Sequence, residues 1–206
     1  MKITKYMTGP IQANTYLAYD EETKKGFIVD PGGYEKRITT QIKDENIDLQ
    51  YIILTHGHGD HIGGVESFKK DFPGAKIVAC REEEPMLKNI IDNCSMEMFR
   101  RVMIIDADIL VKDGDSLQLG STTLNFIHTP GHTEGGMCIY ADKHIFSGDT
   151  LFRRSIGRTD FPGGNFSEII NSIKGKLFNF PDDTIVLPGH MGETTIGEEK
   201  KGNPFV

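Results

Sequence analysis

The chain has 206 residues, of which 37% are hydrophobic and 26% charged, and a formal net charge of −7. This composition is typical of a globular protein with one substantial core, so we expect a single domain over residues 1–206. It excludes an extensively disordered chain. The acidic balance also argues against nucleic acid as a partner, because a broad basic surface that could bind a phosphate backbone is lacking.

The N-terminus and the cysteines bear on the compartment. Residues 1–10 contain lysines but no apolar segment of a signal peptide, and no stretch approaches the roughly 18 apolar residues of a membrane span. We therefore expect no membrane partner. Cys80, Cys94 and Cys138 are widely spaced and odd in number, which argues against disulfides or a cysteine-based zinc knuckle and indicates a cytoplasmic location. Any metal is expected to be held by histidine and carboxylate.

The first 80 residues predict alternating strands and helices. Strands are expected at 14–20, 27–33, 49–55 and 75–80, and helices at 34–46 and 63–72. The first two strands flank a polar turn and therefore predict a hairpin. Ile38 and Ile42 lie four residues apart among polar residues, as in an amphipathic helix.

The second half is richer in strands. Residues 81–104 predict a methionine-rich helix that begins near Pro85, and strands follow at 121–129, 136–141, 144–148 and 184–189. Residues 166–180 predict an amphipathic helix with Asn165 or Ser167 as its N-cap. Two mixed halves of similar make-up favour two sheets packed face to face with helices outside, and a doubly wound α/β sheet is the alternative.

The segment 55–61, THGHGDH, concentrates ligand side chains on the loop after a predicted strand. His56 and His58 are two apart and project to the same side of an extended backbone. The glycines between them let the loop bend until Asp60 and His61 also face inward. Four donors are too crowded for one ion, so we interpret them as two pairs, one for each of two cations.

Three further candidates repeat one pattern, an apolar strand followed by a tight turn and a ligand-type residue: His132, Asp149 and His190. A single histidine in a turn is usually a surface residue, but here five of the seven histidines fall at such turns. A carboxylate can bridge two cations where a histidine cannot, which favours Asp149 as the bridge. His128 is a candidate partner of a ligand, and His144 lies in a polar turn.

The succession H-x-H-x-D-H, TPGHT, SGDTLF and PGH resembles the metallo-β-lactamase superfamily, and within it the glyoxalase II-like hydrolases. The resemblance covers nearly the whole chain. It implies an α/β fold, a four-layer αββα sandwich of two mixed β-sheets with helices on the outer faces and the site at one edge between the sheets. It also implies the metal ligands: His56, His58 and His132 for the first cation, Asp60, His61 and His190 for the second, and Asp149 as the bridge.

Two departures qualify the resemblance. Full-length glyoxalase II has a C-terminal helical domain, whereas this chain ends about sixteen residues past His190 and resembles the short bacterial form. The segment 155–164, SIGRTDFPGG, is also similar to a loop of persulfide dioxygenases, which use a single iron. The presence of Asp60, His61 and His190 favours hydrolysis on two metals instead.

The expected reaction follows from two divalent cations. Together they lower the pKa of a shared water enough to give hydroxide near neutral pH, and they polarise an acyl carbonyl. A thiolate leaves without a strong general acid, and the sequence offers no acid beyond the ligands. We therefore expect a thioester hydrolase, and the resemblance implies the hydroxyacylglutathione hydrolase (glyoxalase II) type, acting on a small glutathione-linked thioester. Asp60 and Asp149 are its expected catalytic residues. Zinc is the expected cofactor, and the same ligands accept iron or manganese.

The loop that follows Asp149 is the expected substrate-binding segment. It contains Phe152, Arg154 and Arg158 within an otherwise acidic chain, and a guanidinium beside the metals could bind a substrate carboxylate. By resemblance, Arg158 falls where glyoxalase II enzymes place a basic glutathione-binding residue. The alternative is a solvated basic loop.

Other functions remain open at this point. The first alternative is a persulfide dioxygenase-like oxidoreductase with one iron, and the second is another hydrolase of the superfamily, such as a lactonase. A nuclease is disfavoured by the acidic charge. A binding or scaffold protein would be expected to lack a ligand, and none is missing. The sequence leaves the oligomeric state, the acyl group and the thiol undetermined.

Overall fold

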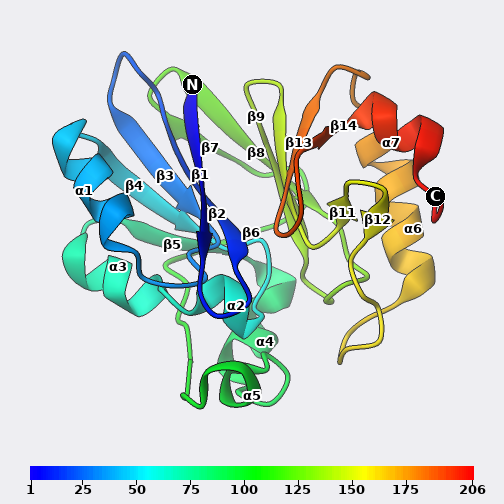
Figure 1. Cartoon of the computed structure of the whole chain (residues 1–206), viewed down its shortest axis with the longest axis horizontal. Helices are drawn as coiled ribbons and strands as arrows, with labels where there is room; N and C mark the ends of the chain where they lie inside the picture. Colours follow the sequence, from blue (N-terminus) through cyan, green and yellow to red (C-terminus); the bar gives the residue numbers. More distant parts are fainter.

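Two six-stranded β-sheets pack against each other, and helices cover their outer faces (Figure 1). The computed structural model describes residues 1–206. The architecture is the four-layer sandwich of two mixed sheets that the family resemblance implies, so that prediction is confirmed. The alternative of one doubly wound sheet is wrong.

The first sheet comes from the N-terminal half and has the order β1-β2-β3-β4-β5-β6. Its strands are β1 (Lys2–Thr8), β2 (Ala13–Tyr19), β3 (Lys25–Val29), β4 (Asp48–Ile53), β5 (Lys76–Cys80) and β6 (Ile109–Val111). The first three strands pair antiparallel, and β3 to β6 run parallel. The carboxyl ends of β3, β4 and β5 therefore meet at one edge of the sheet.

The second sheet has the order β14-β13-β10-β9-β8-β7. Its strands are β7 (Ser116–Leu119), β8 (Thr122–His128), β9 (Met137–Ala141), β10 (His144–Gly148), β13 (Ile185–Pro188) and β14 (Thr194–Thr195). Neighbours pair antiparallel except β10 and β13, so β8, β10 and β13 point the same way. A small hairpin of β11 (Leu151–Phe152) and β12 (Ser155–Ile156) follows β10.

Helices cover the sheets from outside. Those on the first sheet are α1 (Lys36–Asp44) and α3 (Val65–Asp71), and those on the second are α6 (Phe166–Gly175) and α7 (Ile196–Gly202) (Figure 1). The short elements are α2 (Gly59–Ile62), η1 (Arg81–Glu83), α4 (Glu84–Lys88), α5 (Ser95–Phe99) and η2 (Leu177–Asn179). Asn165 caps α6, because its side chain accepts a hydrogen bond from the Glu168 amide. None of the helices combines the length and apolar character that crossing a bilayer requires.

The core between the sheets is built on aromatic side chains. The ring of Phe146 on β10 lies edge-on to those of Tyr16 and Phe27 from the first sheet, with 5.5 Å between ring centroids in both pairs. All three residues are buried. All seven residues of β2 are buried as well, since the other sheet covers one face of this strand and helices cover the other.

Residues 81–104 differ from the single helix that their composition predicts. They form η1, α4 and α5 with irregular chain between them. The buried Asn93 explains the interruption: its side-chain amide donates to the Met103 carbonyl, and its oxygen accepts from the Ser95 amide. Cys94 adopts a left-handed φ of 56°, which a continuing helix does not allow. The sequence pattern also missed β1, a half-exposed edge strand.

The packing of Phe146 gives the first prediction. Phe146→Ala should lower the free energy of unfolding by about 3–5 kcal/mol, because it removes a buried ring from between the sheets and leaves a cavity. Urea denaturation measures the change. Phe166→Ala is the matched control, because Phe166 is 54% exposed and its truncation should cost no more than about 0.5 kcal/mol. Equal losses in the two variants would contradict the described packing.

Candidate metal centre

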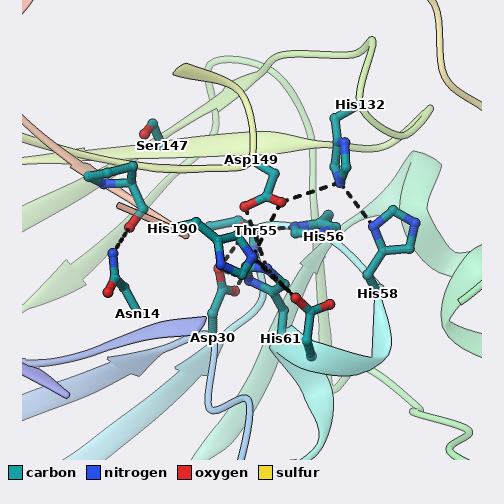
Figure 2. Close-up of polar contacts among 12 residues, drawn as sticks. Asn14, Asp30, Thr55, His56, His58, His61, His132, Ser147, Asp149 and His190 are labelled. Atoms are coloured by element: carbon teal, nitrogen blue, oxygen red, sulfur yellow. Dashed lines mark hydrogen bonds and ion pairs between the residues drawn. The ribbon is translucent and has the colours of Figure 1, made fainter. Parts of the chain in front are cut away.

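The seven predicted ligands gather at the edge where the carboxyl ends of the parallel strands of both sheets meet, and Figure 2 labels all of them except Asp60. The loop after β4 supplies His56 and His58, and α2 supplies Asp60 and His61. The second sheet supplies the rest from the turns after β8, β10 and β13, which are His132, Asp149 and His190. The convergence depends on the sheets facing each other, because each sheet provides only part of the set.

The first group contains three buried histidines. Ligand atoms of His56, His58 and His132 all lie within 4.8 Å of one another. His58 Nδ1 and His132 Nε2 are only 2.9 Å apart, and both point toward the same space. Three imidazoles in this arrangement form a common set of ligands for a divalent transition metal.

The second group lies beside the first. It contains Asp60, His61 and His190, whose ligand atoms also lie within 4.8 Å of one another. His190 Nε2 is 3.1 Å from Asp60 Oδ2 and 3.3 Å from His61 Nε2. Two imidazoles and a carboxylate suit the same class of cations as the first group.

Asp149 lies between the two groups. Its Oδ2 is 3.6 Å from Nε2 of His132 in the first group and 3.7 Å from Nε2 of His190 in the second. Its Oδ1 is 3.5 Å from His61 Nε2. The structure therefore brings the carboxylate within reach of both groups, the position that a bridging ligand requires.

Hydrogen bonds to the far side of three of the rings determine which nitrogen faces the centre. His132 Nδ1 lies 2.7 Å from the Arg158 carbonyl, which can only accept, so Nδ1 carries the proton and Nε2 is free. His61 Nδ1 likewise donates to Asp30 at 3.0 Å. His56 Nδ1 donates to the Thr55 hydroxyl at 3.1 Å, because that hydroxyl donates its own proton to Asp30.

Two polar atoms that face the centre lack partners among the protein groups. His56 Nε2 and Asp149 Oδ1 are buried and accept or donate no hydrogen bond. Buried polar atoms without a partner are costly, and native proteins seldom leave them so. Together with the imidazole and carboxylate chemistry, these atoms fit metal ions as the missing partners.

The charges agree with this assignment. Burial holds the pKa of His56 well below its ordinary value and lowers that of His58 to about 3, so both rings are neutral ligands. Burial also disfavours charged His61, but nearby carboxylates, Asp60 first among them, outweigh it and raise its pKa to about 10. Burial disfavours the Asp60 carboxylate too, yet His61 and His190 hold its pKa below the usual range. The carboxylates thus attract positive charge to this position.

Asp30 supports the centre and was missed in the sequence. Its Oδ1 accepts from the Thr55 amide at 2.8 Å, and its Oδ2 accepts from the Thr55 hydroxyl at 2.6 Å and from His61. Asp30 therefore orients His61 directly and His56 through Thr55. A signal was available, because FIVDPGG places Asp30 after an apolar strand and before a tight turn, as in the segments that carry the ligands.

Glu83 is a second supporting residue. Its buried carboxylate accepts from the Gly57 amide at 2.7 Å, the Thr133 hydroxyl at 2.9 Å and the Gly135 amide at 2.8 Å. It therefore ties the loop between His56 and His58 to the turn that carries His132. Burial raises the pKa of Glu83 to about 7, although these hydrogen bonds act in the opposite direction. The acidic run REEE looks like a solvated surface, so the sequence carried no signal for it.

Contacts with the backbone of their own loops position His190 and Asp149. The Asn14 side chain donates to the carbonyls of Pro188 and Met191 at 2.8 and 2.9 Å, which holds the loop that carries His190 against β2. Before Asp149, Gly148 has a left-handed φ of 48°, and a Cβ there would collide with the Thr55 side chain. A glycine is required at this turn.

A cavity of about 410 Å³ opens onto the centre. Ligands form its floor, and its walls are largely apolar: Ile11, Met98, Phe152, Ile156, Phe161 and Met191. The predicted substrate residue Phe152 therefore lies in the cavity, with its ring 6.2 Å from that of His190.

The two predicted arginines lie in different places. Arg158 lines the cavity, where its guanidinium stacks 4.1 Å from the Phe161 ring centroid and forms two hydrogen bonds with Asp160, of 2.9 and 2.6 Å. The guanidinium of Arg154 instead donates to the Gly202 carbonyl at the end of α7, 2.8 Å away. The structure does not bring Arg154 into the cavity, because its left-handed backbone and this hydrogen bond direct it to the C-terminal helix.

Comparison with known proteins assigns the chain to a family. The sequence profile of the metallo-β-lactamase superfamily matches residues 8–190, which include every candidate ligand described above. The chain belongs to the metallo-β-lactamase superfamily. Its His and Asp cluster and this membership make it a metal-dependent enzyme of the metallo-hydrolase class.

Individual members resemble the chain over nearly its full length. Hydroxyacylglutathione hydrolase GloC of Haemophilus influenzae is 37% identical over 203 residues, which cover 95% of this chain and 93% of that protein. The crystal structure of BLEG-1 B3 metallo-β-lactamase superposes with a TM-score of 0.91 and 38% identity, covering 99% of both chains. TTHA1623, solved in a di-iron-bound form, gives a TM-score of 0.84 and 28% identity, covering 98% of this chain and 100% of its own.

The Asp30 network gives the second prediction. Asp30→Asn should weaken binding of a cation at the group that contains His61 by about 10- to 100-fold, because an amide cannot accept from Thr55 and His61 together. Asparagine tolerates the left-handed backbone of this position. Competition with a chelator measures the affinity. Asp48→Asn, an exposed carboxylate on β4, is the control, and equal affinities in the two variants would remove Asp30 from the supporting network.

Proposed function

We propose that the chain is a binuclear metallohydrolase that cleaves thioesters, of the hydroxyacylglutathione hydrolase type. The observation that carries the proposal is the place of Asp149, whose carboxylate lies 3.5–3.7 Å from histidines of both ligand groups. A carboxylate in that position can hold two cations at one reacting centre. The expected cofactors are two divalent ions, zinc first, with iron or manganese accepted by the same ligands.

A pair of divalent cations would supply an acidic water and polarise the acyl carbonyl. The protein contributes the positions: His56, His58 and His132 on one side, and Asp60, His61 and His190 on the other. Asp60 lines the cavity, so its carboxylate can orient the attacking water. Asp149 lies between the two ligand groups and would contact both cations.

The leaving group follows from what the cavity offers. Apart from the ligands, its titratable lining is limited to Arg158, which does not act as an acid near neutral pH. An alkoxide or amine leaving group would need a proton at this position, whereas a thiolate with a pKa of about 8.5 leaves without one. The apolar walls suit a small acyl group. The similarity to GloC over 95% of this chain supports a glutathione-linked thioester as the substrate.

The similarity to BLEG-1 favours a second candidate, the hydrolysis of β-lactams. The identity of 38% and the coverage of 99% of both chains are as high as for any of the relatives described above. The chemistry at the metals would be the same, but the departing nitrogen of a β-lactam needs a proton, which the cavity does not readily supply.

The third prediction tests the proposed reaction. Protein stripped of metal should be inactive toward S-lactoylglutathione and should recover activity as about two ions of zinc, iron or manganese bind per chain. Asp149→Asn should lower kcat by at least about 100-fold, because the carboxylate that joins the two halves of the site is lost. Elemental analysis with a spectrophotometric assay measures both quantities.

The same preparation separates the alternatives. Full activity with a single ion per chain would contradict the binuclear proposal. One iron with oxygen consumption on glutathione persulfide would instead support the persulfide dioxygenase alternative. Faster turnover of a chromogenic cephalosporin than of the thioester would support the β-lactamase candidate, and turnover of lactones alone would support a lactonase.

The fourth prediction concerns Arg158. Arg158→Ala should raise KM for S-lactoylglutathione by about 10-fold with little change in kcat, because a charge-assisted hydrogen bond to a substrate carboxylate would be lost. Arg154→Ala is the matched comparison and should leave KM unchanged, since its guanidinium bonds to Gly202. Steady-state kinetics of both variants measure the difference. An unchanged KM in Arg158→Ala would contradict a role in substrate binding and leave Arg158 with only its contacts to Asp160 and Phe161.

A further inference from the structure

A second group of metal-ligand side chains lies outside the centre described above. Ligand atoms of Cys80, Glu82 and His128 all lie within 4.8 Å of one another. Cys80 is the last residue of β5 in the first sheet, and His128 is the last residue of β8 in the second. Glu82 lies in η1, immediately after Cys80. The group therefore joins the two sheets, and its members come from three separate elements.

The ring of His128 is oriented as a ligand would be. Its Nε2 lies 2.8 Å from the Glu134 carbonyl, which can only accept, so Nε2 carries the proton. The lone pair is then on Nδ1. A histidine that donates one ring N–H to a carbonyl and keeps the other nitrogen free is the usual arrangement in protein metal sites.

The sulfur and the carboxylate already face each other. Cys80 Sγ donates a hydrogen bond to Glu82 Oε2 at 3.0 Å, and burial raises the pKa of this thiol to about 12. A bound zinc ion lies about 2.3 Å from a sulfur ligand and about 2.0–2.2 Å from a nitrogen or oxygen ligand. The side chain of Glu82 is exposed and that of His128 is half-buried, so both have room to change rotamer toward these distances.

We propose that Cys80, Glu82 and His128, brought together where β5 and β8 end, form a third cation site for a thiophilic divalent ion of the zinc class. A thiolate, an imidazole and a carboxylate are ligands that zinc accepts together, whereas magnesium and calcium prefer oxygen alone. On binding, the sulfur–metal bond replaces the Cys80 S–H bond, and the proton passes to the solvent. The main centre uses only histidine and carboxylate ligands, whereas this site also uses a cysteine.

The site is connected to the main centre through the chain. Glu83, the neighbour of Glu82, holds the Gly57 amide between His56 and His58. Gly135, the next residue after Glu134, donates to the same carboxylate. A cation on Cys80 and His128 would thus fasten the two segments that Glu83 ties together, and it would add a cross-link between the sheets.

The fifth prediction uses cobalt as the probe. A cobalt ion bound by a thiolate gives a sulfur-to-metal charge-transfer band in the near ultraviolet, and the main centre contains no cysteine to produce one. The full-length protein, stripped of metal and titrated with Co²⁺, should show this band and bind about three ions per chain. The band should disappear in Cys80→Ser, in which an oxygen replaces the sulfur, and should weaken in His128→Gln.

Matched variants distinguish the proposal from loss of structure. Cys94→Ala and His144→Gln change the same residue types outside both sites and should keep the band and the stoichiometry. Circular dichroism establishes that each variant is folded. The absence of a thiolate band in folded, cobalt-saturated protein would overturn the proposal, and so would a band that survives in Cys80→Ser. Neither outcome depends on thioesterase activity.

Discussion

The mutual proximity of buried metal-ligand side chains is the constraint on which the rest of this structure depends. Imidazoles and carboxylates in a desolvated space are costly unless each polar atom has a partner. Nε2 of His56 and one oxygen of Asp149 have none among the protein groups. The fold must hold these groups in place against that cost, and divalent cations are the partners that offset it.

The sandwich meets this constraint by dividing the ligands between its two sheets. Strand direction brings the carboxyl ends of β3, β4 and β5 to one edge and those of β8, β10 and β13 to the facing edge. Aromatic packing around Phe146 holds the sheets at a fixed distance. Asp149 then reaches both ligand groups without either sheet having to supply a complete site.

Two buried carboxylates convert this convergence into a defined geometry. Asp30 fixes the tautomer of His61 directly and that of His56 through Thr55. Glu83 ties the loop of His56 and His58 to the turn of His132. Residues that orient ligands in this way influence metal affinity almost as strongly as the ligands do. The largely apolar cavity opens onto the ligands that these residues orient.

The sequence by itself determined the ligand types and most of the strands and helices. Apolar strands that end in a tight turn before His132, Asp149 and His190 are local patterns, and so is the H-x-H-x-D-H loop, because turn chemistry and side-chain alternation act over a few residues. Only the tertiary structure decided which distant groups meet. It buried Glu83 of an apparently solvated acidic run, directed Arg154 to α7 while Arg158 stayed in the cavity, and broke the segment 81–104 at Asn93. These outcomes depend on hydrogen bonds between residues far apart in the chain, and local propensity carries no information about such bonds.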